Sequence, residues 1–440
     1  MSLNYLVNPG YGLKGEIRVP GDKSISHRSI IIGALAEGIT EVVNLLEGED
    51  VLSTVKAMRA LGVRIEAPKE GFLQIYGVGF KGLQSPKAPL NLGNSGTSMR
   101  LLSGVLAGQN FDSRLLGDDS LMARPMERII HPLNLMGASL RGENGDYPPI
   151  VITGNQTLTG IQYDMPVASA QVKSALLLAG LFIDGEVTVR EPGPTRDHTE
   201  RMLEGFGYSL SRESNKISLS GGGTLVGRPI EVPADLSSAA FFLVGAAITP
   251  NSDILLKHVG INPTRTGILK ILELMGADFQ ILNQREVSGE PVADIRIRYS
   301  KLRGIEIPSD LVPLAIDEFP VIFIAAACAE GNTKLSGAAE LKVKESDRIT
   351  SMAIGLDVLG VKNKVTDDGI VISGGVIKGG KVNSFDDHRI AMAFAIAGLA
   401  ATNPIEISNC ENIATSFPNF FEVAQNIGMD IVMKVHSPAV

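Results

Sequence analysis

The chain has little of what marks secreted, membrane-spanning or zinc-binding proteins. Its 440 residues include two cysteines, Cys328 and Cys410, which cannot make a disulfide framework and suit a reducing cytoplasm. The six histidines are dispersed, and no C-x-x-C or H-E-x-x-H motif occurs, so the usual zinc-site patterns are excluded. No apolar run reaches the ~18 residues of a membrane span. No signal peptide is visible after Met1. We therefore expect a cytoplasmic protein without a membrane partner.

The chain also has fewer basic than acidic residues. The 40 Lys and Arg against 48 Asp and Glu give a formal net charge of −8, which argues against nucleic acid as a partner. A small anionic ligand is still allowed, because a local basic cluster decides its binding. Apolar residues are plentiful at 44%, with 20% charged, as in globular proteins with large cores. The length predicts two or three domains.

A sixfold repeat organises the chain. Each copy has a polar turn, a helix of small apolar residues, a strand, a more charged helix ended by a glycine, and further strands. The glycines recur at roughly 70 residues, which suits one βαβαββ unit. They are Gly62, Gly137, Gly207, Gly276, Gly360 and Gly428. Three copies followed by three predict two similar α/β (α+β) domains, one of residues 21–234 and one of residues 1–20 with 235–440.

The first helix of each copy is predicted to start on a small polar or glycine residue. The starts lie near Ser24, Gly96, Ser169, Asp235, Asp317 and Asp386. These helices are apolar nearly all round, which predicts burial. Six such N-termini could surround one ligand, and helix N-termini favour anions. The second helices look amphipathic and are expected at 50–61, 124–136, 196–206, 263–275, 344–359 and 416–427.

Several of these predicted helix starts carry cations, which the helix dipole disfavours. One such case could be a surface salt bridge, but four in equivalent repeat positions indicate a bound anion. Arginine is suited to a bidentate grip on carboxylate or phosphate. We interpret these cations as a cage for several negative charges: Lys23, Arg28, Arg124, Lys344, Arg348 and Arg389.

Other residues at the helix starts allow two interpretations each. Gly96 permits close backbone approach to a ligand, or makes a plain tight turn. Ser169 and Gln171 could bind phosphate or hydroxyl groups, or form an ordinary cap. Asp317 could be a cap, but beside a cationic cage it becomes a candidate general base, and Glu345 a candidate acid or base.

Taken together, segments along nearly the whole chain resemble the EPSP synthase (3-phosphoshikimate 1-carboxyvinyltransferase) family. The matching segments are 21–28, 92–100, 119–126, 169–173, 344–348 and 387–389, with class II-like motifs at 196–200 and 262–265. The resemblance implies two domains of three βαβαββ repeats each, an inside-out α/β barrel, with the active site in the interdomain cleft.

The resemblance also implies the reaction. The enolpyruvyl group of phosphoenolpyruvate moves to the 5-hydroxyl of shikimate 3-phosphate, through a tetrahedral intermediate, giving 5-enolpyruvylshikimate 3-phosphate and phosphate. This step belongs to the shikimate pathway of aromatic amino-acid biosynthesis. No metal or organic cofactor is implied, and we expect a monomer whose partners are its two small-molecule substrates.

Roles carried over by the resemblance fall on the residues already singled out. Asp317 would be the base, with Glu345 and Lys23 as proton-handling partners. Residues expected to bind phosphoenolpyruvate are Lys23, Gly96, Arg124, Gln171, Arg348 and Arg389. Residues expected to bind shikimate 3-phosphate are Lys23, Ser24, Arg28, Ser169, Gln171, Arg196, Asp317 and Lys344.

Some positions depart from the family pattern or bear on rival functions. Thr415 stands where class I members have Lys. Gly96 stands where some glyphosate-insensitive class II members have Ala, so we expect sensitivity, although Leu101 replaces the Pro of many sensitive members. One alternative is the enolpyruvyl transferase acting on UDP-N-acetylglucosamine, but its usual Cys is absent from residues 117–123. Another is a non-catalytic anion-binding repeat protein.

Overall fold

The computed structural model describes residues 2–436, and the chain divides into two compact units. The N-terminal unit comprises Gly21–Val232 and Glu286–Glu290. The C-terminal unit comprises the chain's opening segment through Pro20, Pro233–Arg285, and the segment from Pro291 onward. The predicted division at residue 234 stays a prediction.

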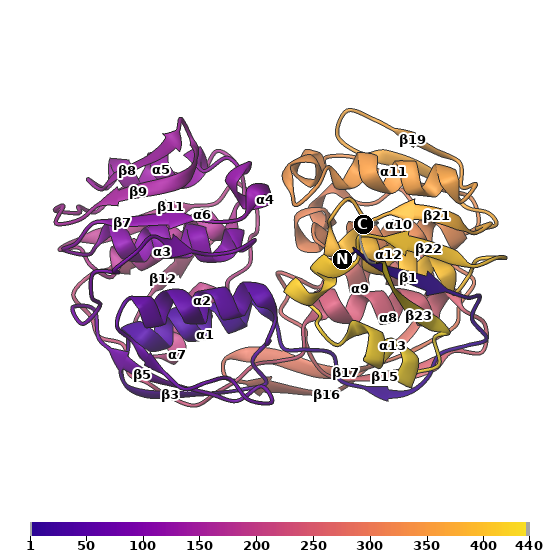
Figure 1. Cartoon of the computed structure of the whole chain (residues 1–440), viewed down its shortest axis with the longest axis horizontal. Coiled ribbons are helices and arrows are strands. Elements are labelled where there is room, and N and C mark those ends of the chain that lie inside the picture. Colours follow the sequence, from indigo (N-terminus) through magenta and orange to yellow (C-terminus); the bar gives the residue numbers. More distant parts are fainter. Residues whose placement is uncertain (1, 437–440) are drawn as a thin grey trace. The chain divides into compact units, whose positions relative to one another are not determined.

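The N-terminal unit contains three four-stranded sheets built to one plan (Figure 1). In each sheet the first two strands pair parallel and the others antiparallel. The first sheet, in spatial order, is β14 (Ile230–Glu231), β3 (Glu37–Val43), β5 (Leu73–Val78) and β4 (Arg64–Ile65). The second is β6 (Leu90–Asn91), β7 (Ser113–Leu116), β9 (Tyr147–Thr153) and β8 (Ser139–Asn144). The third is β10 (Gln162–Asp164), β11 (Glu186–Arg190), β13 (Lys216–Ser220) and β12 (Ser211–Glu213).

Three buried helices fill the centre of this unit, as predicted from their apolar composition. They are α1 (Lys23–Leu35), α3 (Gly96–Ala107) and α6 (Ala170–Gly180). Small residues let α3 and α6 pack closely, since a Cβ added at Gly104 would lie 2.2 Å from the Ala175 carbonyl oxygen. The more charged helices are α2 (Glu49–Ala60), the short α4 (Asp119–Met122), α5 (Glu127–Leu135) and α7 (His198–Gly205).

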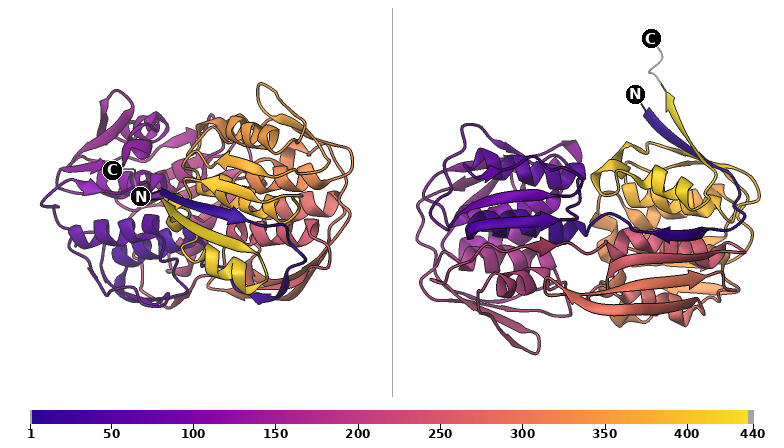
Figure 2. Two further views of the ribbon diagram at one scale, coloured as in Figure 1. Left: turned by 45° about the vertical axis from the view of Figure 1, so that its right-hand side comes forward. Right: turned by 90° about the horizontal axis from the view of Figure 1, so that it is seen from below.

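The C-terminal unit has three further sheets, two of four strands and one of three. The first is β16 (Asp278–Val287), β17 (Glu290–Arg298), β15 (Asp253–Gly260) and β2 (Lys14–Ile17). The second is β18 (Asn332–Leu335), β20 (Ile370–Ser373) and β19 (Asn363–Val365). The third is β21 (Gly380–Asn383), β22 (Ile405–Ser408), β1 (Ser2–Val7) and β23 (Ile431–His436). The opening strand β1 therefore completes the sheet of the last repeat, as Figure 2 shows.

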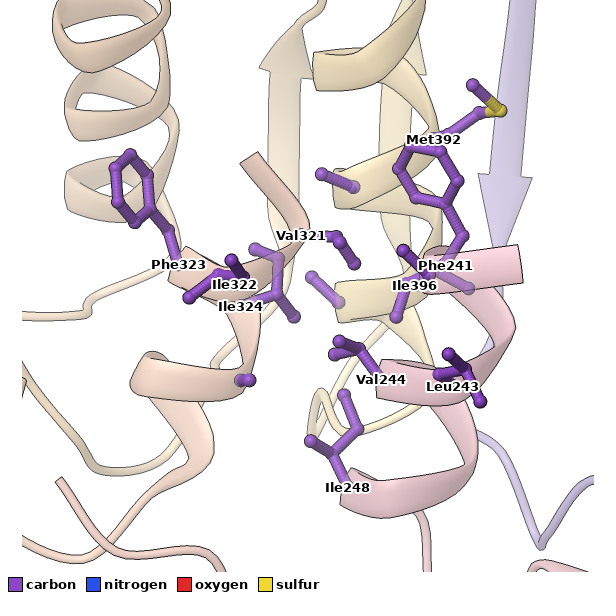
Figure 3. Packing of buried hydrophobic residues seen from close by; sticks show 14 of the residues in the cluster. Phe241, Leu243, Val244, Ile248, Val321, Ile322, Phe323, Ile324, Met392 and Ile396 are labelled. Carbon is purple, nitrogen blue, oxygen red and sulfur yellow. The ribbon is translucent and has the colours of Figure 1, made fainter. Parts of the chain in front are cut away.

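Three apolar helices again form the core of this unit, namely α8 (Leu236–Ile248), α10 (Phe319–Cys328) and α12 (His388–Gly398). Figure 3 shows their side chains gathered between them, with Val244, Ile324 and Ile396 among those labelled. The other helices are α9 (Gly267–Leu274), α11 (Arg348–Val358) and α13 (Phe420–Asn426), with 3₁₀ turns η1 (Ser309–Leu311), η2 (Pro313–Ala315), η3 (Ala339–Val343) and η4 (Glu411–Thr415). Within residues 2–436, none of these helices combines the length and apolar character needed to span a bilayer.

The predicted α/β fold of three repeats in each unit is confirmed. The predicted helix-ending glycines are confirmed too, because all six adopt left-handed φ between 76° and 99° after the second helices. Most predicted starts of the second helices are wrong. Arg124, Arg196 and Lys344 lie in the turns before α5, α7 and α11 rather than inside them. At α11 the reason is the cap: the Asp347 side chain accepts from the Thr350 amide, so the helix begins only at Arg348.

Candidate active site

The first part of the candidate site is the start of α1 in the N-terminal unit. Asp22 caps this helix by accepting the Ile25 amide at 2.8 Å. Lys23 occupies the first helical position and its ammonium pairs with the buried Asp50 carboxylate of α2. The Lys23 side chain keeps 18% of its surface exposed, so it can still reach a ligand. Asp50 carries no local signal as this partner, because it is an acidic residue in the first turn of its helix, as many helices have.

Arg28 lies one turn further along α1 and is only 3% exposed. Its Nε donates to Thr199 Oγ1 at 2.7 Å, and its Nη2 donates to Ser174 Oγ at 2.8 Å. Its Nη1 donates to the Ser24 carbonyl at 3.0 Å. Burial lowers the pKa of the guanidinium to about 10, and the nearby Glu200 opposes that effect. The guanidinium is thus fixed by neutral oxygens from α1, α6 and α7.

The start of α3 forms the second part. Ser95 caps this helix, accepting the Ser98 amide at 3.1 Å, and places Gly96 first in the helix. A Cβ added at Gly96 would lie 2.7 Å from Arg100 Nη1 and 3.3 Å from Arg124 Nη1, so two guanidinium groups converge beside this glycine. Arg124 Nη2 donates to Asn94 Oδ1 at 2.6 Å. This convergence at a helix N-terminus suits an anion.

Gln171 joins α6 to α3. Its Oε1 accepts from Arg100 Nη1 at 2.9 Å, and its Nε2 donates to Thr97 Oγ1 at 3.0 Å. Ser169 caps α6 and accepts the Val172 amide at 3.3 Å. The structure therefore brings the predicted residues Gln171, Gly96 and Arg124 to one place. Sequence reasoning missed Arg100, which lies four residues into a helix where only its first turn was considered.

A chain of buried hydroxyl groups connects α1 and α3. His27 Nδ1 lies 2.7 Å from Thr54 Oγ1, which lies 2.6 Å from Ser98 Oγ, and that atom lies 2.6 Å from Ser95 Oγ. Burial lowers the pKa of His27 well below its usual value, and the charges of Lys23 and Arg28 lower it further. The imidazole is therefore neutral and serves the helix starts as a structural hydrogen-bonding group.

In the C-terminal unit, Arg348 is the centre of a carboxylate cluster and is 1% exposed. Its Nε donates to Asp387 Oδ2 at 2.8 Å and its Nη2 to Glu345 Oε2 at 2.6 Å. Its Nη1 lies 3.4 Å from Asp317 Oδ1. Burial alone would lower the pKa of Arg348, but the three carboxylates raise it overall. Arg348 therefore fixes Glu345 and Asp317, while both carboxylates keep partial exposure, 24% and 15%.

Two other predicted cations lie next to Asp317. Lys344 Nζ is 3.7 Å from Asp317 Oδ1, and Arg389 Nη1 donates to the Asp317 carbonyl at 3.2 Å. The alternative that Asp317 is a helix cap is wrong, because Glu318 occupies the N-cap of α10 and makes no side-chain cap bond. Asp387, which sequence reasoning left without a role, caps α12 through the Arg389 amide and holds Arg348. Its signal in the sequence was only that of an ordinary N-cap.

Each unit therefore supplies different chemistry. The N-terminal unit offers cations and helix N-termini suited to binding anions. The C-terminal unit offers partly exposed carboxylates held beside cations, which suits proton transfer near an anionic substrate. Arg196 lies half-buried in the turn before α7. Within residues 2–436, no group of three or more His, Cys, Asp or Glu side chains is arranged to hold a metal ion.

Comparisons with known proteins show the family of the chain. A family model described as EPSP synthase (3-phosphoshikimate 1-carboxyvinyltransferase) matches residues 7–424. The chain is 61% identical to the 3-phosphoshikimate 1-carboxyvinyltransferase of Methylococcus capsulatus over 427 residues, covering 97% of this chain and 98% of that protein. It is 60% identical to the protein of the same name from Nitrosococcus oceani, covering 98% and 97%.

Solved structures show the same relationship. The EPSP synthase from Acinetobacter baumannii superimposes with a TM-score of 0.89 at 57% identity, covering 99% of this chain and 100% of that one. The enolpyruvyl transferase NikO from Streptomyces tendae shares the fold, with a TM-score of 0.79 at 17% identity over 99% of this chain and 100% of that one. The match of the family model over residues 7–424, with identities near 60% along the full length, shows that this chain belongs to the EPSP synthase (3-phosphoshikimate 1-carboxyvinyltransferase) family.

Proposed function

We propose that the residues assigned below carry out the transfer of the enolpyruvyl group of phosphoenolpyruvate to the 5-hydroxyl of shikimate 3-phosphate, releasing phosphate. The reaction is that of the family, and it belongs to the shikimate pathway of aromatic amino-acid biosynthesis. The observation that carries the residue assignment is the cluster around Arg348, where one buried guanidinium holds Asp317 and Glu345 at partial exposure.

Asp317 is the proposed general base for the 5-hydroxyl. A base must lie within hydrogen-bonding reach of the proton that it removes, and it must be held still. Lys344 and Arg348 contact its carboxylate at 3.7 and 3.4 Å, and Arg389 binds its carbonyl, so the group is fixed from three directions. The same three cations favour the presence of an anionic substrate next to the base.

Protonation of C3 of phosphoenolpyruvate requires an acid, and positive charge then develops at C2. Glu345 and Lys23 are the proposed proton-handling groups, and neighbouring carboxylates stabilise the developing charge. Glu345 is held by Arg348 at 2.6 Å, and Lys23 is held by Asp50. Phosphate leaves in the elimination step, and the proton gained at C3 is lost again from that carbon.

The cations and helix starts are the proposed binding groups for the two anions. The proposed phosphoenolpyruvate group comprises Lys23, Gly96, Arg124, Gln171, Arg348 and Arg389. The proposed shikimate 3-phosphate group comprises Lys23, Ser24, Arg28, Ser169, Gln171, Arg196, Asp317 and Lys344. Support comes from the convergence of Arg100 and Arg124 beside Gly96 and from the fixed guanidinium of Arg28. We also propose that the protein works in the cytoplasm as a monomer that binds only these two small molecules.

The test is Asp317→Asn, assayed by phosphate release from the two substrates. Loss of the base should reduce kcat by about 10²- to 10⁴-fold. Asp310→Asn is the matched control, because Asp310 is an exposed carboxylate in the preceding turn η1. Retention of full kcat by Asp317→Asn would show that the base is another residue.

A further inference from the structure

The two buried arginines of the site are partnered in opposite ways. Arg348 contacts three carboxylates, whereas Arg28, which is 3% exposed, makes its hydrogen bonds to Thr199 Oγ1, Ser174 Oγ and the Ser24 carbonyl. Within the part of the chain that the structure describes, Arg28 makes no ion pair with a carboxylate. A buried arginine without an anionic partner is costly and therefore calls for a reason.

The geometry of the two hydroxyl groups suggests that reason. The Nε and Nη2 hydrogens lie on one edge of a guanidinium, the edge that usually binds both oxygens of a carboxylate. Here Thr199 Oγ1 and Ser174 Oγ accept from that edge at 2.7 and 2.8 Å, and the two oxygens lie 2.7 Å apart. Both hydroxyl residues are fully buried. They thus take the place of a carboxylate without carrying its charge.

The two carboxylates with the largest electrostatic effect on Arg28, those of Glu200 and Asp22, have other partners. Glu200, which follows Thr199 in α7, pairs with the buried ammonium of Lys173 at 2.6 Å. Asp22 accepts the Ile25 amide as the cap of α1. Both act on Arg28 only through space, and burial, the larger effect, lowers its pKa to about 10. Three of the five guanidinium N–H groups make these hydrogen bonds to residues within 2–436, so the other two can meet a ligand.

We propose that Thr199 and Ser174 are positioning residues that hold Arg28 through neutral hydrogen bonds, so that its full positive charge acts on an anionic group of shikimate 3-phosphate. The inference rests on the proposed function. It adds that the lack of a carboxylate partner at Arg28 favours substrate binding, since a carboxylate in that place would compete with the substrate for the positive charge.

The first test compares Thr199→Val with Thr199→Ser. Valine keeps the shape of threonine and removes the acceptor, so the KM for shikimate 3-phosphate should rise about 10-fold or more. Serine keeps the hydroxyl, so this KM should stay within about 3-fold of wild type. The KM for phosphoenolpyruvate should stay within about 3-fold in both variants. Thr188→Val is the matched control, because it removes a buried hydroxyl that is paired with Ser218 in the sheet.

The second test is Ser174→Asp, which adds a carboxylate to the same edge of Arg28. An unchanged fold, measured by circular dichroism, should accompany a rise of at least 10-fold in the KM for shikimate 3-phosphate. If this variant does not fold, the comparison of Thr199→Val with Thr199→Ser is the test of the proposal. Equal KM values for Thr199→Val and Thr199→Ser, or an unchanged KM in folded Ser174→Asp, would overturn the inference. Wild-type enzyme without turnover of the two substrates would instead overturn the proposed function.

Discussion

Alanine substitutions at two glycines of α3, Gly96 and Gly104, are expected to affect different properties of the protein. The atoms nearest a Cβ at Gly96 are side-chain nitrogens, Arg100 Nη1 at 2.7 Å and Arg124 Nη1 at 3.3 Å. A Cβ at Gly104, eight residues further along α3, would lie 2.2 Å from the backbone oxygen of Ala175. The first change can be absorbed by side-chain movement, whereas the second requires α3 and α6 to separate. We therefore expect Gly96→Ala to impair substrate binding and Gly104→Ala to impair folding stability.

The size of the effect follows from the contacts. An ordinary carbon–nitrogen contact is about 3.5 Å, so Arg100 Nη1, which lies 2.7 Å from the added Cβ and donates to Gln171 at 2.9 Å, must move by about 0.8 Å. Losing one hydrogen bond of a charged group costs about 1.5–3 kcal/mol. If the displaced guanidinium loses one hydrogen bond to phosphoenolpyruvate, the KM for this substrate rises about 10- to 150-fold. Stability should be unchanged or higher by about 0.4–1 kcal/mol, because alanine suits a helix with negative φ.

The assay is steady-state phosphate release with each substrate varied, together with urea unfolding of both variants. Gly104→Ala should lose about 1–3 kcal/mol or more of stability through overpacking. The same kinetics tests the expected glyphosate sensitivity, since the inhibition constant should rise in Gly96→Ala. An unchanged KM for phosphoenolpyruvate, or a stability loss equal to that of Gly104→Ala, would refute the reasoning.

Two predictions concern buried charges. His27 keeps a pKa well below its usual value in the folded protein, so below about pH 6.5 only the unfolded chain binds the proton and the wild type loses stability by up to about 1.4 kcal/mol per pH unit. In His27→Gln, the free energy of unfolding, measured in urea between pH 7.5 and 5, should not show this loss as the pH falls. Lys173→Met leaves the carboxylates of Glu191 and Glu200 buried without their ammonium partner, so the free energy of unfolding should fall by about 3–5 kcal/mol in urea titrations.

Each of these predictions has a control within the chain. Parallel pH profiles for wild type and His27→Gln would contradict the neutral buried imidazole. For the lysine, the control is Arg190→Met, because the Arg190–Asp164 pair is 52% and 74% exposed and should contribute at most about 1 kcal/mol. Equal losses in Lys173→Met and Arg190→Met would contradict the role of burial.

Local signals explain why most of the fold was predictable. The recurring glycines adopt the left-handed φ that ends a helix, and Ser169 caps its helix, as one of its two interpretations had it. These features depend on a few neighbouring residues, so the sequence displays them directly. Strand β1 pairs with β22 and β23, which are distant in sequence, and no local sequence pattern predicts this pairing.

Some residues of the candidate site likewise have a local signal in the sequence, and others do not. Lys23, Arg348 and Arg389 were predictable because a cation at a helix start opposes the helix dipole, and all three lie in the first turns of their helices. Arg100 and Asp50 were missed because their importance comes from contacts with Gln171 and Lys23, which are distant in sequence. Tertiary contacts of this kind carry no periodic signal.

The most direct measurement of the central claim is phosphate release by the purified wild-type protein with defined acceptors. The account predicts release from phosphoenolpyruvate when shikimate 3-phosphate is present, and none with phosphoenolpyruvate alone or with UDP-N-acetylglucosamine as the acceptor. Release with the nucleotide sugar, or no release with shikimate 3-phosphate, would contradict it.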